Sequence, residues 1–178
     1  MVNPEILREV MLENREEVMR REVIKRSISL DGFERQVLVG ARRAGKSYLM
    51  YGKIQELLAQ GHSWDEIVYL NFEDERLAGM ELNDLNKIFE VHAGLGGERP
   101  MLFLDEIQNI DGWEHFARRV ADSKLTVFIT GSNAKMLSVD VSAALGGRYM
   151  TREVFPMQFD EYLMSNGVNS GDELLTAT

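Results

Sequence analysis

The chain has 178 residues, no cysteine and a formal net charge of −9 at pH 7. This length suits one domain with a sizeable hydrophobic core. The lack of cysteine excludes disulfides and thiolate metal sites and agrees with a cytoplasmic location. No apolar stretch approaches the ~20 residues of a membrane-spanning helix, and the N-terminus does not read as a secretory signal. The acidic balance argues against a broad phosphate-binding surface, so nucleic acid is not an expected partner of this segment.

Residues 1–30 predict an N-terminal helical segment that precedes a main domain at 31–178. Asn3-Pro4 is a helix-start signal, and apolar residues then recur at helical spacing. The stretch Asn14–Glu17 fits a capping box and predicts that a second helix begins there. The charged run 15–26 mixes both signs, which is typical of a solvated helix face.

Strand patterns alternate with helix patterns through the rest of the chain. Strand patterns lie at 36–39, 67–72, 101–104 and 125–130, and a short fifth strand is expected at 150–155. Helices are expected at 46–60, 82–91 and 111–121, with a last helix at 158–164. This alternation predicts a three-layer α/β fold around a mainly parallel sheet.

A glycine-rich segment follows the first predicted strand. Its residues are Gly40, Ala41, Arg42, Arg43, Ala44, Gly45, Lys46 and Ser47. They match G-x-x-x-x-G-K-[ST], the phosphate-binding P-loop, with a strand before it and a helix after it. Lys46 is predicted to reach the β- and γ-phosphates, Ser47 to place its hydroxyl on Mg²⁺, and Tyr48 to complete the binding set. The sequence therefore predicts a nucleotide-binding protein.

Two adjacent carboxylates follow the third predicted strand. Asp105 and Glu106 come at its C-terminal end, where open α/β sheets bind ligands. Asp105 is predicted to hold the Mg²⁺ that Ser47 also binds. Glu106 is predicted to orient and polarise the attacking water. The alternative for the pair is a turn and a helix cap, which acidic residues also form.

A polar pair follows the fourth predicted strand in the same way. Ser132 and Asn133 can hydrogen-bond a γ-phosphate or the attacking water, and so report whether the nucleotide is intact. The alternative is again a turn and a cap. The two residues together favour the sensing role.

Six motifs carry a resemblance to a known family. They are Gly40–Ser47, Asn71-Phe72-Glu73-Asp74, Leu104-Asp105-Glu106, Thr130-Gly131-Ser132-Asn133, Gly147-Arg148 and Phe155 to Tyr162. With them the chain resembles AAA+-type ATPases, most closely a prokaryotic family of predicted ATPases with a separate C-terminal domain of unknown function. The resemblance covers residues from about 24 to 163. The P-loop and the Asp-Glu pair are shared by the whole superfamily, whereas the double arginine, the Asn-Phe-Glu-Asp motif and the Phe-Pro element are narrower markers.

The resemblance implies a five-stranded core in the order 5-1-4-3-2 and ATP as the nucleotide. It places Ser132 or Asn133 at the sensor-1 position. The chain ends at Thr178 without the helical lid and the C-terminal domain of that family, so this segment is expected to lack both. Arg148 follows a glycine pair and lies in sequence range to act as an arginine finger on a neighbouring subunit, which implies a homo-oligomer. Its alternative role is a surface arginine paired with an acidic helix.

The leading interpretation is a Mg²⁺-dependent ATPase module that hydrolyses ATP to ADP and phosphate and thereby drives or gates an unknown protein partner. Three alternatives stay open: a non-catalytic nucleotide-dependent switch or scaffold, a small-molecule kinase, and a nucleic-acid motor. The paired carboxylates fit activation of water better than transfer to a bound hydroxyl. The sequence shows no arginine-rich lid segment, which a small-molecule kinase usually has.

Overall fold

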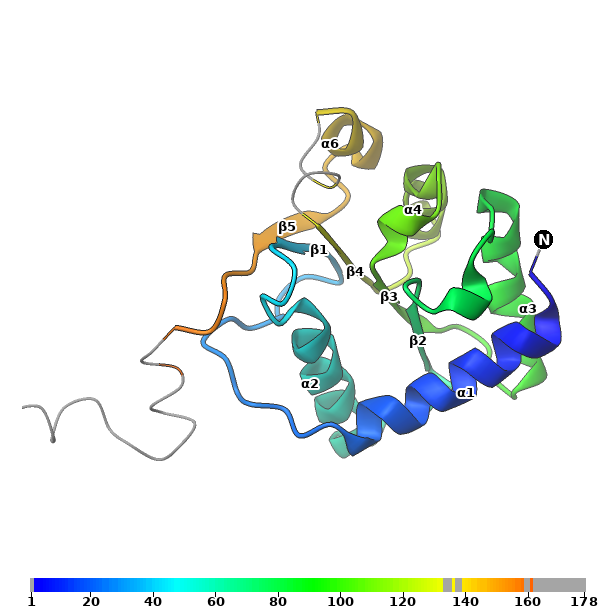
Figure 1. The fold of residues 1–178 in the computed structure, drawn as a ribbon, viewed down its shortest axis with the longest axis horizontal. Coiled ribbons are helices and arrows are strands. Elements are labelled where there is room, and N and C mark those ends of the chain that lie inside the picture. The colour runs from blue at the N-terminus through cyan, green and yellow to red at the C-terminus, as the bar shows by residue number, and fades with distance from the viewer. Residues whose placement is uncertain (1, 133–135, 137–138, 159–160, 162–178) are drawn as a thin grey trace, which may run out of the picture.

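The computed structural model describes residues 2–132, 136, 139–158 and 161. Five strands form one all-parallel sheet in the order β2-β3-β4-β1-β5 (Figure 1). They are β1 (Arg35–Gly40), β2 (Ile67–Asn71), β3 (Met101–Asp105), β4 (Val127–Ser132) and β5 (Met150–Glu153). Counted from the other edge, this is the predicted order 5-1-4-3-2, which is confirmed.

In the described part of the chain, one helix precedes the first strand and the others lie between strands. They are α1 (Pro4–Arg20), α2 (Lys46–Ala59), α3 (Lys87–Gly94), α4 (Trp113–Asp122) and α6 (Val139–Leu145). Short 3-10 turns lie at Glu75–Leu77, Leu82–Asn86 and Ile107–Asn109. The predicted helix 82–91 therefore begins as a 3-10 turn and continues as α3. Most of the predicted helix 158–164 lies outside the described residues. No helix in the described part of the chain is both long enough and apolar enough to span a membrane.

The strand side chains divide between two cores, one on each face of the sheet. Val37 and Val39 pack in the cluster that contains residues of α3 and α4. Leu38, between them, packs in the cluster that contains residues of α2. Successive side chains of a strand point to opposite faces, so a strand buried on both faces is apolar throughout. The predicted three layers are confirmed, with helices on both faces of the sheet (Figure 1).

The N-terminal helix is one continuous element. Asn3 Oδ1 accepts a hydrogen bond from the Glu5 N–H at 2.9 Å, and Pro4 is the first helical residue, as the start signal predicts. The prediction of a second helix at Asn14 is wrong. The same helix also ends at Arg20, so the prediction of a helix face as far as residue 26 is wrong as well.

Burial explains why α1 does not break. Leu7, Met11 and Val18 form a stripe at helical spacing, and all are at most 1% exposed. Packing of such a stripe outweighs a local capping signal. Leu7 and Met11 join the core on one face of the sheet, whereas Val18 joins the core on the other face. The helix therefore passes along the edge strand β2 and covers it, which shields an edge that is otherwise open to pairing.

The C-terminal end of β1 lies very close to the chain that leaves β5. The Val154 N–H donates to the Val39 carbonyl oxygen at 2.6 Å. A Cβ atom built on Gly40 would lie 2.3 Å from the Val154 carbonyl oxygen. The first P-loop glycine is thus needed for contact between two backbones at the edge of the sheet, in addition to any role toward phosphate.

We expect Gly40→Ala to destabilise the fold by about 1–3 kcal/mol, because the new methyl group forces β5 away from β1. Denaturant unfolding of the purified variant measures this loss. The matched control is Gly94→Ala at the end of α3, where nothing lies within 4 Å of the added Cβ. The control should leave the free energy of unfolding unchanged or raise it slightly. Equal stability of Gly40→Ala and the wild type would contradict the close-contact explanation.

Candidate active site

The P-loop connects β1 to α2 at the carboxyl edge of the sheet. Arg43 and Gly45 have φ angles of 65° and 91°, which is left-handed backbone. Gly45 immediately precedes α2. Left-handed residues in such a loop turn successive N–H groups toward one concave surface, and the N-terminus of the helix adds the positive end of its dipole. This backbone fits a phosphate chain.

Lys46 folds back over the loop. It is 4% exposed, and its Nζ donates to the Gly40 and Ala41 carbonyl oxygens, both at 3.1 Å. The same Nζ lies 3.5 Å from Glu106 Oε1. The ammonium group is thus held at the mouth of the phosphate loop and beside the predicted catalytic carboxylate.

Asp105 is the last residue of β3 and is 1% exposed. The Thr130 hydroxyl donates to its Oδ1, and the Tyr69 hydroxyl donates to its Oδ2 at 2.8 Å. Ser47 is also close enough to the carboxylate to affect its pKa. Burial raises the pKa of Asp105 above its ordinary value, and the neighbouring Ser47, Thr130 and Tyr69 side chains oppose that rise. The structure therefore brings together the two predicted metal-binding residues, Ser47 and Asp105.

Glu106 has a backbone conformation that non-glycine residues rarely adopt, with φ 55° and ψ 41°. Its N–H donates to Thr130 Oγ1 at 2.9 Å, and the Gln108 side-chain amide donates to its Oε2. The Thr130 hydroxyl therefore links both carboxylate residues, since it donates to Asp105 and accepts from Glu106. Strained backbone of this kind is often found where a side chain must be aimed at a ligand.

The donor atoms at this edge fit Mg²⁺ bound together with phosphate. Magnesium prefers hard oxygen ligands and usually takes one or two carboxylates, waters and phosphate oxygens. The Ser47 hydroxyl and the Asp105 carboxylate carry such oxygens, and they lie near each other. Within the described part of the chain there is no cluster of three or more His, Asp or Glu able to hold a metal. The hydroxyl of Ser47 and the carboxylate of Asp105 fit a metal that is shared with a nucleotide.

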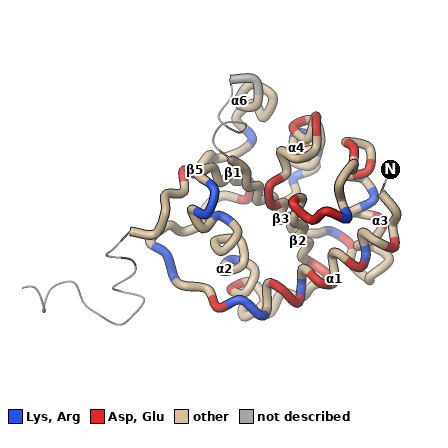
Figure 2. Tube along the Cα trace, viewed as in Figure 1, with Lys and Arg blue, Asp and Glu red and all other residues tan. Residues whose placement is uncertain are grey.

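The other predicted binding residues surround the loop. Arg42 is exposed, and its Nη2 lies 3.2 Å from Glu73 Oε1. Ala44 N–H donates to the Ala41 carbonyl oxygen at 3.2 Å and closes the turn. Figure 2 shows basic residues on the P-loop and acidic residues where the chain leaves β2 and β3, at the same edge of the sheet. This edge carries charges of both signs next to each other.

Of the predicted sensor pair, the structure describes Ser132. Ser132 ends β4, is partly buried and pairs in register with Gly40 at the start of the P-loop. It is therefore placed beside the phosphate loop, where a sensor is expected. Asn133 lies outside the described residues, so its predicted role stays a prediction.

Arg148 lies near the amino-terminal ends of the strands, whereas the P-loop lies at their carboxyl ends. It comes two residues before Met150, which pairs with Gln36 at the beginning of β1. Its Nε donates to Asp122 Oδ1 at 2.6 Å, at the end of α4. Arg148 therefore does not reach the P-loop of its own chain, and the arginine-finger role remains a prediction that needs a neighbouring subunit.

Arg26 is a contact of the P-loop that the sequence patterns do not indicate. Its Nη1 donates to the Ala44 carbonyl oxygen at 3.2 Å, and its Nη2 donates to the Phe155 carbonyl oxygen at 2.9 Å. Its Nε donates to Glu161 Oε2 at 3.1 Å. Hydrogen bonds from Ser27 and Arg26 lower the pKa of Glu161 to about 2. One guanidinium thus ties the segment before β1 and the segment after β5 to the phosphate loop.

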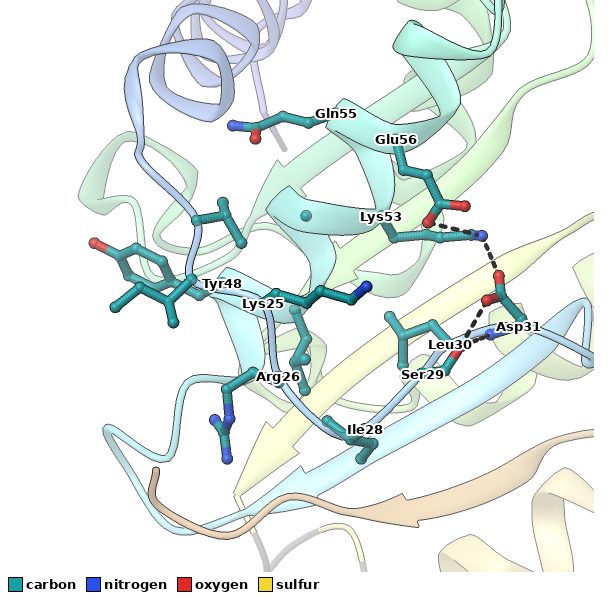
Figure 3. Close-up of a pocket in the computed structure, with 14 residues that line it drawn as sticks. Lys25, Arg26, Ile28, Ser29, Leu30, Asp31, Tyr48, Lys53, Gln55 and Glu56 are labelled. Atoms are coloured by element: carbon teal, nitrogen blue, oxygen red, sulfur yellow. Dashed lines mark hydrogen bonds and ion pairs between the residues drawn. The ribbon is translucent and has the colours of Figure 1, made fainter. Parts of the chain in front are cut away.

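A groove of about 600 Å³ lies between residues 23–31 and the outer side of α2. In Figure 3, Tyr48 and Arg26 lie at one end of the groove, and Lys53, Glu56 and Asp31 lie at the other end. The Tyr48 end adjoins the P-loop, because Tyr48 directly follows Ser47 and Arg26 bonds the Ala44 carbonyl oxygen. Tyr48 is 42% exposed, so its ring is available to a ligand.

An all-parallel sheet with a P-loop after β1 and two adjacent carboxylates at the end of β3 defines the P-loop nucleoside-triphosphatase fold. A family model described as the AAA domain matches residues 33–163. The chain therefore belongs to the AAA domain family, among the AAA+-type P-loop ATPases, which bind nucleotides. This confirms the family resemblance at the level of the AAA+ class.

Two curated relatives are uncharacterized proteins. One, from Methanocaldococcus jannaschii, is 37% identical over 172 residues, which is 95% of this chain and 38% of the relative. The other, from Haemophilus influenzae, is 32% identical over 142 residues, which is 79% of this chain and 36% of the relative. The chain thus spans little more than a third of the length of either protein.

A solved structure of Hsp104 with ATPγS and FITC-casein has the same fold. The TM-score is 0.53 with 16% sequence identity, over 92% of this chain and 29% of that chain. This likeness concerns the arrangement of helices and strands.

Proposed function

We propose that this chain binds Mg-ATP at the P-loop and hydrolyses it to ADP and phosphate. The observation that carries the proposal is the convergence of Lys46, Asp105 and Glu106 at one edge of the sheet. Lys46 Nζ lies 3.5 Å from Glu106 Oε1, and Asp105 lies near the P-loop serine. The family to which the chain belongs supports the nucleotide, and the geometry of the carboxylates supports the hydrolysis.

In the proposed bound state, the phosphate chain lies in the loop between Arg43 and Ser47. Lys46 exchanges the Gly40 and Ala41 carbonyl oxygens and the Glu106 carboxylate for β- and γ-phosphate oxygens. A hydrogen bond between a cation and a phosphate is stronger than one to a neutral carbonyl, so this exchange favours binding. Bound Mg²⁺, held by Ser47 and Asp105, supplies charge neutralisation at the phosphates.

For hydrolysis, Glu106 accepts a hydrogen bond from a water molecule and polarises it. The water oxygen attacks the γ-phosphorus, and the bond from that phosphorus to the β–γ bridging oxygen breaks. Glu106 takes one proton of the water and passes it to an oxygen of the inorganic phosphate that forms, while ADP is the leaving group. Gln108 and Thr130 hold Glu106 in place for this step. Ser132 and Asn133 are proposed to contact the γ-phosphate or the water from the end of β4.

The base and ribose are proposed to lie at the Tyr48 end of the groove. Tyr48 follows the metal-binding serine directly, so a nucleotide whose phosphates fill the loop extends along this side of α2. An exposed aromatic ring offers a stacking surface that any base accepts. The Arg26 guanidinium stands at the same end of the groove (Figure 3).

We further propose that the ATPase cycle drives or gates a protein partner. The relatives are more than twice as long as the matched region, so a larger protein offers surfaces beyond this domain. The net charge of −9 gives no support for nucleic acid as the partner of this segment.

Phosphate release from ATP tests the proposed reaction. We expect release with Mg-ATP, none in EDTA, and no dependence on added hydroxyl acceptors. Phosphate that appears on an acceptor instead of free in solution would identify a kinase. Tight Mg-ATP binding without any release at high protein concentration would identify a switch.

Arg148 is expected to act only between subunits. If it does, specific activity rises with protein concentration, and Arg148→Ala flattens this rise without weakening ATP binding. Arginine fingers contribute about 10³–10⁵ in rate, because they place a cation where charge gathers in the transition state. The matched control is Asp122→Asn, which removes the ion-pair partner but keeps the arginine, and it should preserve the rise. Activity that does not depend on concentration and is unchanged in Arg148→Ala would leave the Asp122 pair as the role of this residue.

A further inference from the structure

A tyrosine in the core reaches the metal-binding carboxylate from the neighbouring strand. Tyr69 lies in β2, is 2% exposed, and donates its hydroxyl to Asp105 Oδ2 at 2.8 Å. The strand register pairs Tyr69 with Phe103, and Asp105 comes two residues after Phe103. Residues two apart in a strand share one face, so the tyrosine and the carboxylate are diagonal neighbours on the α2 side of the sheet.

The carboxylate of Asp105 is held from both flanking strands. β3 lies between β2 and β4 in the sheet. Tyr69 on β2 donates to Oδ2, and Thr130 on β4 donates to Oδ1. One donor on each oxygen fixes the rotation of the carboxylate about its Cβ–Cγ bond. Ser47 approaches the same group from the P-loop side, where the metal is proposed to bind.

The surrounding packing does not need a hydroxyl at position 69. The next two aromatic residues of this layer, Phe103 and Phe128, stack with their ring centroids 4.8 Å apart and carry no polar atom. A hydroxyl buried in such surroundings costs free energy unless it is hydrogen-bonded. The hydrogen bond to Asp105 therefore explains why residue 69 is a tyrosine and not a phenylalanine.

A second tyrosine supports the ring of the first. Tyr51 packs edge-on against Tyr69, with centroids 5.3 Å apart and an interplanar angle of 76°. The two hydroxyl oxygens lie 3.3 Å apart. Tyr51 lies in α2, one helical turn after Ser47, so the tyrosine that supports Tyr69 and the predicted metal-binding serine share one helix. This arrangement fixes where the Tyr69 hydroxyl can point.

We propose that Tyr69 is a positioning residue that orients Asp105 for Mg²⁺ and thereby sets the affinity of the site for the metal. The inference rests on the proposed function, because it takes Asp105 as the metal-binding carboxylate. It assigns the tyrosine no contact with the metal or the nucleotide.

Tyr69→Phe removes one oxygen atom and keeps the ring. We expect it to weaken the binding of Mn²⁺, used as a spectroscopic probe for Mg²⁺, by about 10- to 100-fold in the presence of ADP, since a residue that orients a metal ligand typically has an effect of this size. Electron paramagnetic resonance titration of free Mn²⁺ measures this directly. Binding of ADP in EDTA, measured by calorimetry, should stay at the wild-type value, because the phosphate loop is untouched.

Tyr149→Phe is the matched control. Tyr149 is a partly buried tyrosine, and its hydroxyl donates to the Ala117 carbonyl oxygen at 2.6 Å, on the other side of the sheet from α2. It should lower the melting temperature by a similar amount and leave Mn²⁺ affinity unchanged. Asp105→Asn is the positive control and should abolish the contribution of the metal to ADP binding.

Three results would overturn the inference. Wild-type Mn²⁺ affinity in Tyr69→Phe, with a loss in Asp105→Asn, would leave Tyr69 with a packing role only. An equal loss of metal-free ADP affinity in Tyr69→Phe would show general damage to the site. If Asp105→Asn itself keeps wild-type Mn²⁺ affinity, the metal assignment in the proposed function is wrong, and the role of Tyr69 fails with it. Circular dichroism spectra and melting temperatures of all variants establish that each is folded.

Discussion

Lys46→Met is expected to weaken Mg-ATP binding by about 100-fold or more. A hydrogen bond to a charged group contributes roughly 1.5–3 kcal/mol, and each 1.4 kcal/mol is a factor of ten in affinity. Methionine keeps the length of the side chain, which matters because Lys46 is only 4% exposed and fills the space above the loop. Calorimetric titration with Mg-ATP measures the effect.

The control for this variant is Lys87→Met. Lys87 lies in α3 and pairs with Asp84 at 2.9 Å, on an element that does not contact the P-loop. It removes the same charge and should keep wild-type ATP affinity. Wild-type affinity in Lys46→Met would contradict the assignment of the P-loop as the nucleotide site.

Glu106→Gln is expected to slow hydrolysis by about 10²–10⁴ while ATP still binds. Glutamine keeps the shape of the side chain and cannot accept the proton of the attacking water. ATP affinity should be unchanged or higher, because Lys46 loses a carboxylate 3.5 Å away that competes with the phosphates. Rapid-quench measurement of ADP formation, with binding measured in parallel, separates the two effects.

Glu98→Gln serves as the control for this variant, because Glu98 is exposed and lies before β3, away from the P-loop. It should hydrolyse ATP at the wild-type rate. If Glu106→Gln also hydrolyses ATP at that rate, Glu106 has only the structural role of a turn residue. Its left-handed backbone would then have no catalytic explanation.

Strands β1 to β4 are predictable from sequence because each is a largely apolar run that is buried on both faces, whereas the residues of β5 are mostly exposed. The run 101–104, for example, becomes β3, and its end at Asp105 falls where the pattern changes from apolar to acidic. Strand order is not encoded in such runs. It came from the family resemblance, since motifs identify which strand carries the P-loop and which carries the carboxylates.

Contacts between distant segments account for what the sequence does not predict. From the sequence, Tyr69 is predicted only as a strand residue. Its hydrogen bond to Asp105 can be inferred only when the register of β2 and β3 is known. From the sequence, Thr130 is predicted only as the end of a buried strand, although its hydroxyl hydrogen-bonds both Asp105 and Glu106. Arg26 reads as part of a charged helix face, whereas the helix ends at Arg20 and the arginine bonds the P-loop.

The role of the Asn-Phe-Glu-Asp motif also becomes clear only in the structure. The Phe72 N–H donates to the Asp105 carbonyl oxygen at 2.9 Å, and the Asn109 side chain donates to the Phe72 carbonyl oxygen at 3.1 Å. The Asn71 side chain accepts from the Glu73 N–H at 2.9 Å. The motif therefore fixes the turn after β2 against the turn that carries Glu106.

A single-turnover experiment, with protein in excess over radiolabelled Mg-ATP, tests the central claim most directly. Excess protein favours complete binding and any assembly that Arg148 requires. The account predicts conversion of the bound ATP to ADP and free phosphate, dependent on Mg²⁺ and strongly slowed in Glu106→Gln. ATP that remains intact on the wild-type chain, or turnover that persists at the wild-type rate in both Lys46→Met and Glu106→Gln, would contradict it.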